Sequence, residues 1–215
     1  MTDPFTNRPI ELRKYTTVIL CEGKDECFVV SELCKDWQDR PGIGVVDRGH
    51  GTEKEMAALA QQAPLCRIQA IGFVFDAEKS RAKILSTLKT WYETAGLEMP
   101  KRAGTLKVSL LGGNYRVRTG YSITPHGKPS GWLESLFIPQ IRKSDVWPCI
   151  DGLVACYTDN CPSDQNIDKV IVRTFIAHRN AYNTGLGVAL RDKILTCEDH
   201  SFDALRRFLV RLEAA

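Results

Sequence analysis

Two short apolar segments that each end in carboxylates constrain this chain more than any other feature. The segment TTVILC (16–21) is followed by Glu22, and the segment AIGFVF (70–75) is followed by Asp76 and Glu78. Apolar, β-branched runs of this length are typical of buried strands in a parallel sheet, which binds ligands beyond the carboxyl ends of its strands. The pattern therefore predicts that the three carboxylates meet at one edge of the sheet, where they would suit a hard divalent cation. The alternative is that these acids face solvent and cap helices, as acids at loop starts often do.

The elements around these segments alternate between strand and helix. The spacing of apolar residues predicts a strand over 43–46 and helices over 25–39, 52–63 and 80–95. This alternation predicts a parallel sheet with right-handed crossovers. The glycine-rich loop 47–51 is suited either to a phosphate or to a plain turn between strand and helix. It is not a phosphate-binding P-loop, because the G-x-x-x-x-G-K-[ST] motif occurs nowhere in the chain.

The pattern changes after residue 104. Two β-segments, 106–111 and 116–123, flank Gly112-Gly113-Asn114, which predicts a hairpin. A further acid, Glu134, stands at the start of a helix among apolar neighbours. Two later stretches have helical spacing, 165–181 and 202–212, whereas 143–161 is assigned to no element. We expect three parts: a polar lead-in (1–14), an α/β core (15–140) and a mainly helical C-terminal part packed on the core (141–215).

Composition limits the classes of function. The chain of 215 residues is long enough for one sizeable core, and its net charge of +3 neither requires nor excludes a nucleic-acid partner. Eight cysteines occur without a C-x-x-C pair, which favours reduced thiols and a cytoplasmic protein. A zinc site built from Cys156, Cys161 and a histidine is an alternative for two of them, although the spacing fits no recurrent ligand pattern. No apolar run approaches the roughly 18 residues that a membrane span needs, so no membrane partner is expected.

At this point the motifs resemble a known family. Residues 18–26 (VILCEGKDE) resemble the first motif of the Toprim domain, a glutamate-glycine pair after a hydrophobic strand. Residues 73–78 (FVFDAE) resemble its second motif, D-x-D, with a glutamate as the second acid. Toprim domains occur in topoisomerases, primases, RecR and OLD-family nucleases. The closer resemblance is to small stand-alone Toprim-related, OLD-nuclease-like proteins of bacteria and archaea, which are also similar at 131–136 (GWLESL) and across 169–212.

The resemblance implies a fold and a role for each matching residue. The fold is Toprim-like (Rossmann-like) α/β, a mainly parallel sheet flanked by helices, with a C-terminal helical extension. Glu22 matches the proposed general acid or base, and Asp76 and Glu78 match the metal-binding acids. Glu26 matches an acid that is associated with a second metal, and Glu134 matches the acid of a later G-x-L-E motif. Glutamate in place of aspartate at position 78 lengthens one ligand by a methylene, which could shift or weaken the metal.

These matches imply a metal-dependent phosphodiesterase, a nuclease acting on DNA or RNA with Mg²⁺ or Mn²⁺. Basic residues are candidate phosphate contacts, although most such side chains simply face solvent. The candidates are Lys79, Arg81, Lys83, Arg116 and Arg118.

Resemblance also implies a biological setting and leaves alternatives open. Related stand-alone proteins are often toxic effectors of anti-phage defence that work with an ATPase partner, and a homo-oligomer is allowed. The rival interpretation is a non-catalytic Toprim-fold module for protein interaction or nucleic-acid binding, because RecR-like proteins use the fold as a platform. A nucleotide-binding or nucleotidyl-transfer enzyme is a third option, which loop 47–51 permits.

Overall fold

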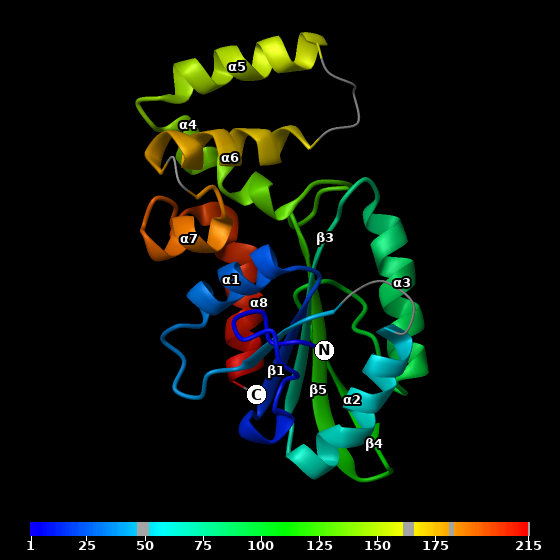
Figure 1. The fold of residues 1–215 in the computed structure, drawn as a ribbon. Helices are drawn as coiled ribbons and strands as arrows, with labels where there is room; N and C mark the ends of the chain where they lie inside the picture. The colour runs from blue at the N-terminus through cyan, green and yellow to red at the C-terminus, as the bar shows by residue number, and fades with distance from the viewer. Residues whose placement is uncertain (47–51, 161–165, 181–182, 215) are drawn as a thin grey trace.

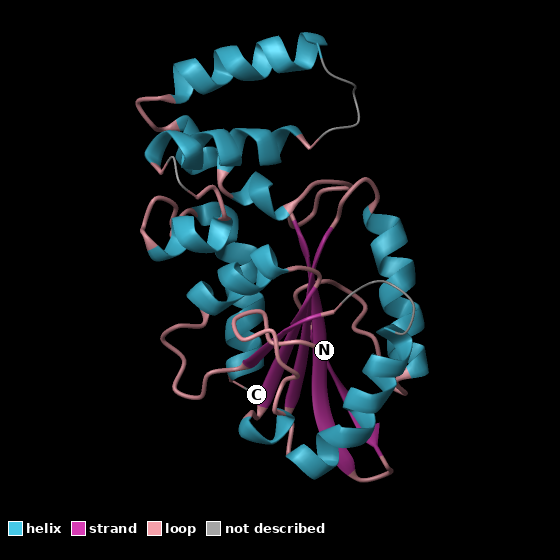
Figure 2. Ribbon diagram, viewed as in Figure 1, coloured by secondary structure: helices cyan, strands magenta, loops and turns pink. Residues whose placement is uncertain are grey.

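The computed structural model describes residues 1–46, 52–160, 166–180 and 183–214. Its centre is a five-stranded sheet with the order β2-β1-β3-β5-β4, flanked by helices on both faces (Figures 1 and 2). The strands are β1 (Thr17–Cys21), β2 (Gly42–Val45), β3 (Ala70–Asp76), β4 (Leu106–Leu111) and β5 (Tyr115–Thr124). The α-helices are α1 (Lys24–Leu33), α2 (Thr52–Cys66), α3 (Arg81–Thr94), α4 (Ile138–Arg142), α5 (Trp147–Asn160), α6 (Ile167–Arg179), α7 (Leu186–Arg191) and α8 (Asp203–Glu213). Short 3₁₀ helices are η1 (Leu12–Lys14), η2 (Leu133–Leu136) and η3 (His200–Phe202).

The sheet is parallel except at one edge. Strands β2, β1, β3 and β5 run in the same direction, whereas β4 pairs antiparallel with β5 as a hairpin. Every residue of β1 and β3 is buried, which is why their sequences are continuous apolar runs rather than alternating ones. The register places Cys21 opposite Val74 and Asp76 opposite Thr124. The carboxyl ends of β1, β3 and β5 therefore share one edge.

Two hydrophobic cores hold the layers together, one on each face of the sheet. Helices α2 and α3 cover one face through residues such as Met56 and Trp91. Helices α1 and α8 cover the other face, through residues such as Val29 and Phe208. Helix α8 comes unusually close, because a Cβ built on Gly72 would lie 2.4 Å from Cδ1 of Leu212. The glycine in the middle of β3 thus lets Leu212 pack directly on the strand.

The C-terminal helices extend the structure beyond the carboxyl edge of the sheet. Helix α6 packs on η2 and α4, and α5 packs on α6 at the far end of the molecule (Figure 1). Helix α5 has one buried residue, Ile150, among those that the structure describes. None of the described helices is long and apolar enough to cross a membrane.

The structure confirms the expected α/β fold with a mainly parallel sheet and C-terminal helices. The predicted hairpin is present, with its turn at 112–114. Helix α1 ends at Leu33 rather than near residue 39, because Cys34 leaves helical geometry (φ −101°, ψ 8°). The polar lead-in contacts the sheet: Thr2 exchanges backbone hydrogen bonds with Val45 on the edge strand. The loop 47–51 and Cys161 of the suggested zinc pair lie outside the described residues.

Candidate metal site

A cavity of about 480 Å³ opens at the carboxyl edge of the sheet. All five acids singled out from the sequence line it. They are Glu22, Glu26, Asp76, Glu78 and Glu134. The other lining residues are Gly23, Lys24, Asp25, Trp132, Asn166 and Lys169. Segments that are far apart in the sequence therefore supply one wall each: the start of α1, the loop after β3, η2 and the start of α6.

Glu22 reaches across from β1 to the end of β3. Its Oε2 lies 3.4 Å from the backbone nitrogen of Asp76, which donates to it. Its own backbone N–H donates to the carbonyl of Val74, which continues the β1–β3 ladder by one residue. The half-buried Glu22 side chain is thus held beside Asp76 by the sheet itself.

Asp76 is the most enclosed carboxylate of the site. It is 6% exposed, and its Oδ1 accepts a 2.7 Å hydrogen bond from the hydroxyl of Thr124. Burial raises the pKa of Asp76 well above its usual range, and the nearby charges of Glu26 and Glu134 act in the same direction. The Thr124 hydroxyl and the backbone N–H of Leu133 lower that pKa but do not cancel the effect of burial. A cation beside Asp76 would relieve this cost of holding a charge.

Glu26 closes the cavity at the start of α1. It is 8% exposed, and its carboxylate folds back over Gly23, where a built Cβ would lie 2.8 Å from Oε2. Burial raises the pKa of Glu26, as do the charges of Asp25 and Glu134, while the backbone N–H groups of Glu26 and Gly23 lower it. Gly23 leaves room for this carboxylate at the N-terminus of α1, where the helix dipole favours negative charge.

Glu78 is placed by an unusual backbone conformation. Its φ is +48°, in the left-handed region that non-glycine residues seldom adopt. An isolated antiparallel bridge fixes it: the N–H of Gly131 donates a 2.8 Å hydrogen bond to the Glu78 carbonyl. Backbone strain of this kind recurs at functional sites, where the surrounding contacts hold it.

Glu134 and Lys169 form an ion pair at the site. Glu134 sits on η2 and is 7% exposed, and its Oε1 lies 3.7 Å from Nζ of Lys169 on α6. Asn166 caps α6 by accepting a 3.0 Å hydrogen bond from the backbone N–H of Lys169. Two helix N-termini, of α1 and α6, thus contribute residues to the same cavity.

The oxygen atoms that line the cavity are suitable ligands for a hard cation, but they do not form a complete metal site. Carboxylate oxygens are the ligands that Mg²⁺ and Mn²⁺ prefer. Of the three buried carboxylates, Glu134 is paired with a cation, Lys169, within the ranges that the structure describes. Yet no three Asp, Glu, His or Cys side chains of the described residues are arranged to hold one ion as they stand. Mutual repulsion separates like-charged carboxylates, so an ion would have to draw them together.

The basic residues proposed as phosphate contacts divide into three groups. Lys79 and Lys83 are exposed near the start of α3. Arg81 points elsewhere: its Nη1 donates to the carbonyls of Ile123 and Pro125, at 3.2 and 3.4 Å, and so ties α3 to the end of β5.

Arg116 and Arg118 lie at the opposite end of β5 from the cavity. Arg118 is the register partner of Ala70, the first residue of β3, and its Nη1 donates to the carbonyl of Ala214. Arg116 lies still farther from the carboxyl edge, in the same strand. Six residues of strand, about 20 Å, separate Arg118 from Thr124. The structure therefore places these two arginines away from the cavity, because β5 runs parallel to β3 and begins at the opposite edge. Their contact with a phosphate stays a prediction.

Several lining residues escaped the sequence reasoning. Lys24, Asp25, Trp132, Asn166 and Lys169 all line the cavity. Asp25 lies in the VILCEGKDE motif and Trp132 in the GWLESL segment, but neither was assigned to a site. Lys169 and Asn166 could not be assigned, because only the packing of α6 against η2 brings them there.

Comparison with known proteins gives a family and a distant structural likeness. No curated protein matches. The C-terminal region of the OLD protein from Xanthomonas campestris pv. campestris is similar over 91% of this chain and 85% of that chain, at 12% identity and a TM-score of 0.35. Residues 16–214 match the family described as "Protein of unknown function (DUF3226)". Since that match covers nearly the whole sequence, the chain belongs to this family.

Proposed function

We propose that the chain is a metal-dependent phosphodiesterase that cleaves DNA or RNA with Mg²⁺ or Mn²⁺. The observation that carries the proposal is the group of buried carboxylates around one cavity. Asp76, Glu26 and Glu134 are each less than 10% exposed, and burial raises the pKa of Asp76 and Glu26. Burying several like charges is costly unless a cation compensates them. A structural role alone gives no reason to gather them beside an opening to solvent.

Asp76 and Glu78 would hold the cation, with Glu26 and Glu134 available to a second one. When bound, a divalent cation supplies positive charge that stabilises the developing charge on a scissile phosphate.

The chain's own residues would orient the substrate and move a proton. Glu22 lies beside Asp76 and is half-buried, so it can accept a proton from an attacking water or donate one to a leaving oxygen. Lys169 would attract the phosphate, helped by the N-termini of α1 and α6, which favour anions. The exposed Lys79 and Lys83 remain candidates for contacts farther along a strand. Nucleic acid is therefore the proposed partner, and an ATPase partner and a role in anti-phage defence rest on the resemblance of the motifs alone.

The test is cleavage by matched glutamate variants. Plasmid DNA, single-stranded DNA and RNA are incubated with Mg²⁺ or Mn²⁺ and either wild type, Glu22→Gln or Glu93→Gln. Glu93 is exposed on α3 and does not line the cavity, so its variant controls for the loss of a carboxylate. We expect Glu22→Gln to lose at least about a hundredfold in rate, the lower range for a general acid or base, and Glu93→Gln to cleave like wild type. Equal cleavage by all three proteins would show that a contaminant cuts the substrate.

A second candidate is a non-catalytic module that binds nucleic acid or protein. One observation favours it: no three metal-ligating side chains are ready to hold an ion among the described residues. This candidate predicts that wild type retains nucleic acid in a binding assay but cleaves none of the three substrates with either cation.

A further inference from the structure

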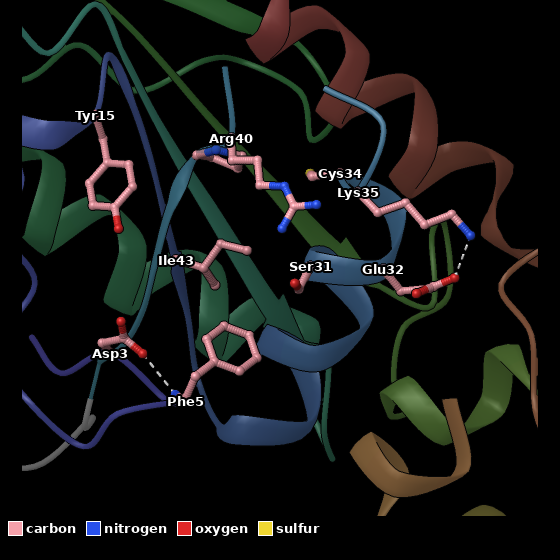
Figure 3. Close-up of a pocket in the computed structure, with 10 residues that line it drawn as sticks. Asp3, Phe5, Tyr15, Ser31, Glu32, Cys34, Lys35, Arg40 and Ile43 are labelled. Carbon is pink, nitrogen blue, oxygen red and sulfur yellow. Dashed lines mark hydrogen bonds and ion pairs between the residues drawn. The ribbon is translucent and has the colours of Figure 1, made fainter. Parts of the chain in front are cut away.

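A second cavity, also of about 480 Å³, lies at the other end of α1 (Figure 3). We call it the Arg40 pocket; the residues that matter are Asp3, Phe5, Tyr15, Ser31, Arg40 and Ile43. No residue that lines it also lines the carboxylate cavity. A function of the Arg40 pocket therefore does not depend on the proposed nuclease function.

The Arg40 pocket has fixed walls. Oδ1 of Asp3 accepts hydrogen bonds from the backbone N–H groups of Phe5 (2.8 Å) and Thr6 (3.1 Å), which forms a tight turn. The Phe5 ring then packs edge-on against Phe28 of α1, with centroids 5.4 Å apart. On another side the Tyr15 ring lies against Gly42, where a built Cβ would be 2.6 Å from Cδ2. Two aromatic rings thus face the pocket in positions set by their own contacts.

Arg40 brings an uncompensated positive charge to these walls. Its side chain extends into the pocket, toward Ser31 in the view of Figure 3. The nearby acid Glu32 is already paired, with Oε1 2.7 Å from Nζ of Lys35. In the described part of the chain, the Arg40 guanidinium and the hydroxyls of Ser31 and Tyr15 have no hydrogen-bond or ion-pair partner.

Asp3 supplies a hydrogen-bond acceptor at a different wall. Its Oδ1 is used by the turn, and no described residue bonds to its Oδ2. The pocket therefore contains the Arg40 guanidinium, the Ser31 hydroxyl and a carboxylate oxygen of Asp3. Two aromatic rings and the apolar Ile43 also line it. Polar groups that converge beside aromatic and aliphatic side chains are typical of small-molecule sites.

We propose that the Arg40 pocket binds a nucleoside monophosphate. A guanidinium binds a phosphate through paired N–H donors, and the Ser31 hydroxyl would add a donor beside it. The planar base would lie against Phe5 and Tyr15, since aromatic side chains stack on every base. The amino group of a base such as adenine would donate to Oδ2 of Asp3. Inorganic phosphate would contact Arg40 but not the aromatic rings. An uncharged nucleoside would contact the aromatic rings and Asp3 but not Arg40.

The test is calorimetric titration of the metal-free chain with AMP, adenosine and inorganic phosphate. We expect saturable binding of AMP that is at least about tenfold tighter than that of either fragment. Arg40→Ala is expected to weaken the binding of AMP at least about tenfold, because one charge-assisted contact is lost. Arg13→Ala is the matched control, because Arg13 is exposed and does not line the pocket. Glu22→Gln is expected to bind AMP like wild type, which separates this site from the carboxylate cavity.

Three results would overturn the proposal. They are no saturable AMP binding up to millimolar concentration, AMP binding by Arg40→Ala equal to that of wild type, and AMP affinity no higher than that of inorganic phosphate. Arg40 is exposed, so circular dichroism and thermal unfolding should show that its variant folds like wild type.

Discussion

The hydroxyl of Thr124 donates a 2.7 Å hydrogen bond to Oδ1 of Asp76, and the two residues are register partners at the ends of β5 and β3. Both side chains are buried. The same hydroxyl lies 3.2 Å from the carbonyl of Phe75, so it also contacts the backbone just before the carboxylate. A threonine that no sequence motif singled out thus orients the central acid of the site.

Replacing Thr124 by valine removes this hydroxyl without changing the shape of the side chain. We expect the free energy of unfolding to fall by about 1–3 kcal/mol, the cost of leaving a buried polar group unsatisfied. The loss should be larger at pH 8 than at low pH, because a charged Asp76 needs the donor more than a neutral one. Urea unfolding measures it, and Thr90→Val, at an exposed position of α3, is the control. A loss that is equal in the two variants would contradict the account.

The pH dependence of stability should carry the signature of a buried acid. Burial raises the pKa of Asp76 in the folded chain, so the folded state holds its proton at pH values where the unfolded state has released it. The associated stability is complete below the ordinary carboxyl range, about pH 4, and is lost as pH rises through the folded pKa. Asp76→Asn, which cannot ionise, should therefore be more stable than wild type at pH 8 in EDTA, and similar to it near pH 4. Urea unfolding across this range tests the sign; a variant less stable than wild type at pH 8 would contradict it.

Lys169 should affect substrate and metal in opposite ways. Lys169→Met keeps the aliphatic stem but removes the charge 3.7 Å from Glu134. We expect nucleic-acid cleavage to fall at least about tenfold, because an attractive charge is lost from the cavity. Mn²⁺ affinity should stay equal or rise by up to about fivefold, since a partly exposed pair is worth at most about 1 kcal/mol. Arg173→Met, at an exposed position of the same helix, is the control; weaker Mn²⁺ binding by Lys169→Met alone would contradict this role.

The sequence predicts those parts of the fold that depend on local pattern. Continuous apolar runs identified β1 and β3, and the Gly112-Gly113-Asn114 turn identified the hairpin. Helix α5 lies in the stretch to which no element was assigned, although Trp147, Ile150 and Val154 recur at helical spacing and contact the core.

The sequence predicted only those features of the site that follow from the order and direction of the strands. Parallel strands bring their ends together, and Glu22, Asp76 and Glu78 do line one cavity, while their roles remain predictions. Side-chain partners across the fold were not predictable. Arg81 and Arg118 resemble phosphate-binding residues in sequence, but their guanidinium groups donate to backbone carbonyls. Lys169 enters the site through helix packing, which leaves no local signature.

The measurement that bears most directly on the central claim is titration of the chain with Mn²⁺ at pH 8, followed by calorimetry, for wild type and Asp76→Asn. We expect saturable binding by wild type and at least about tenfold weaker binding by the variant. No binding by wild type up to millimolar Mn²⁺, or equal binding by the two proteins, would contradict this claim.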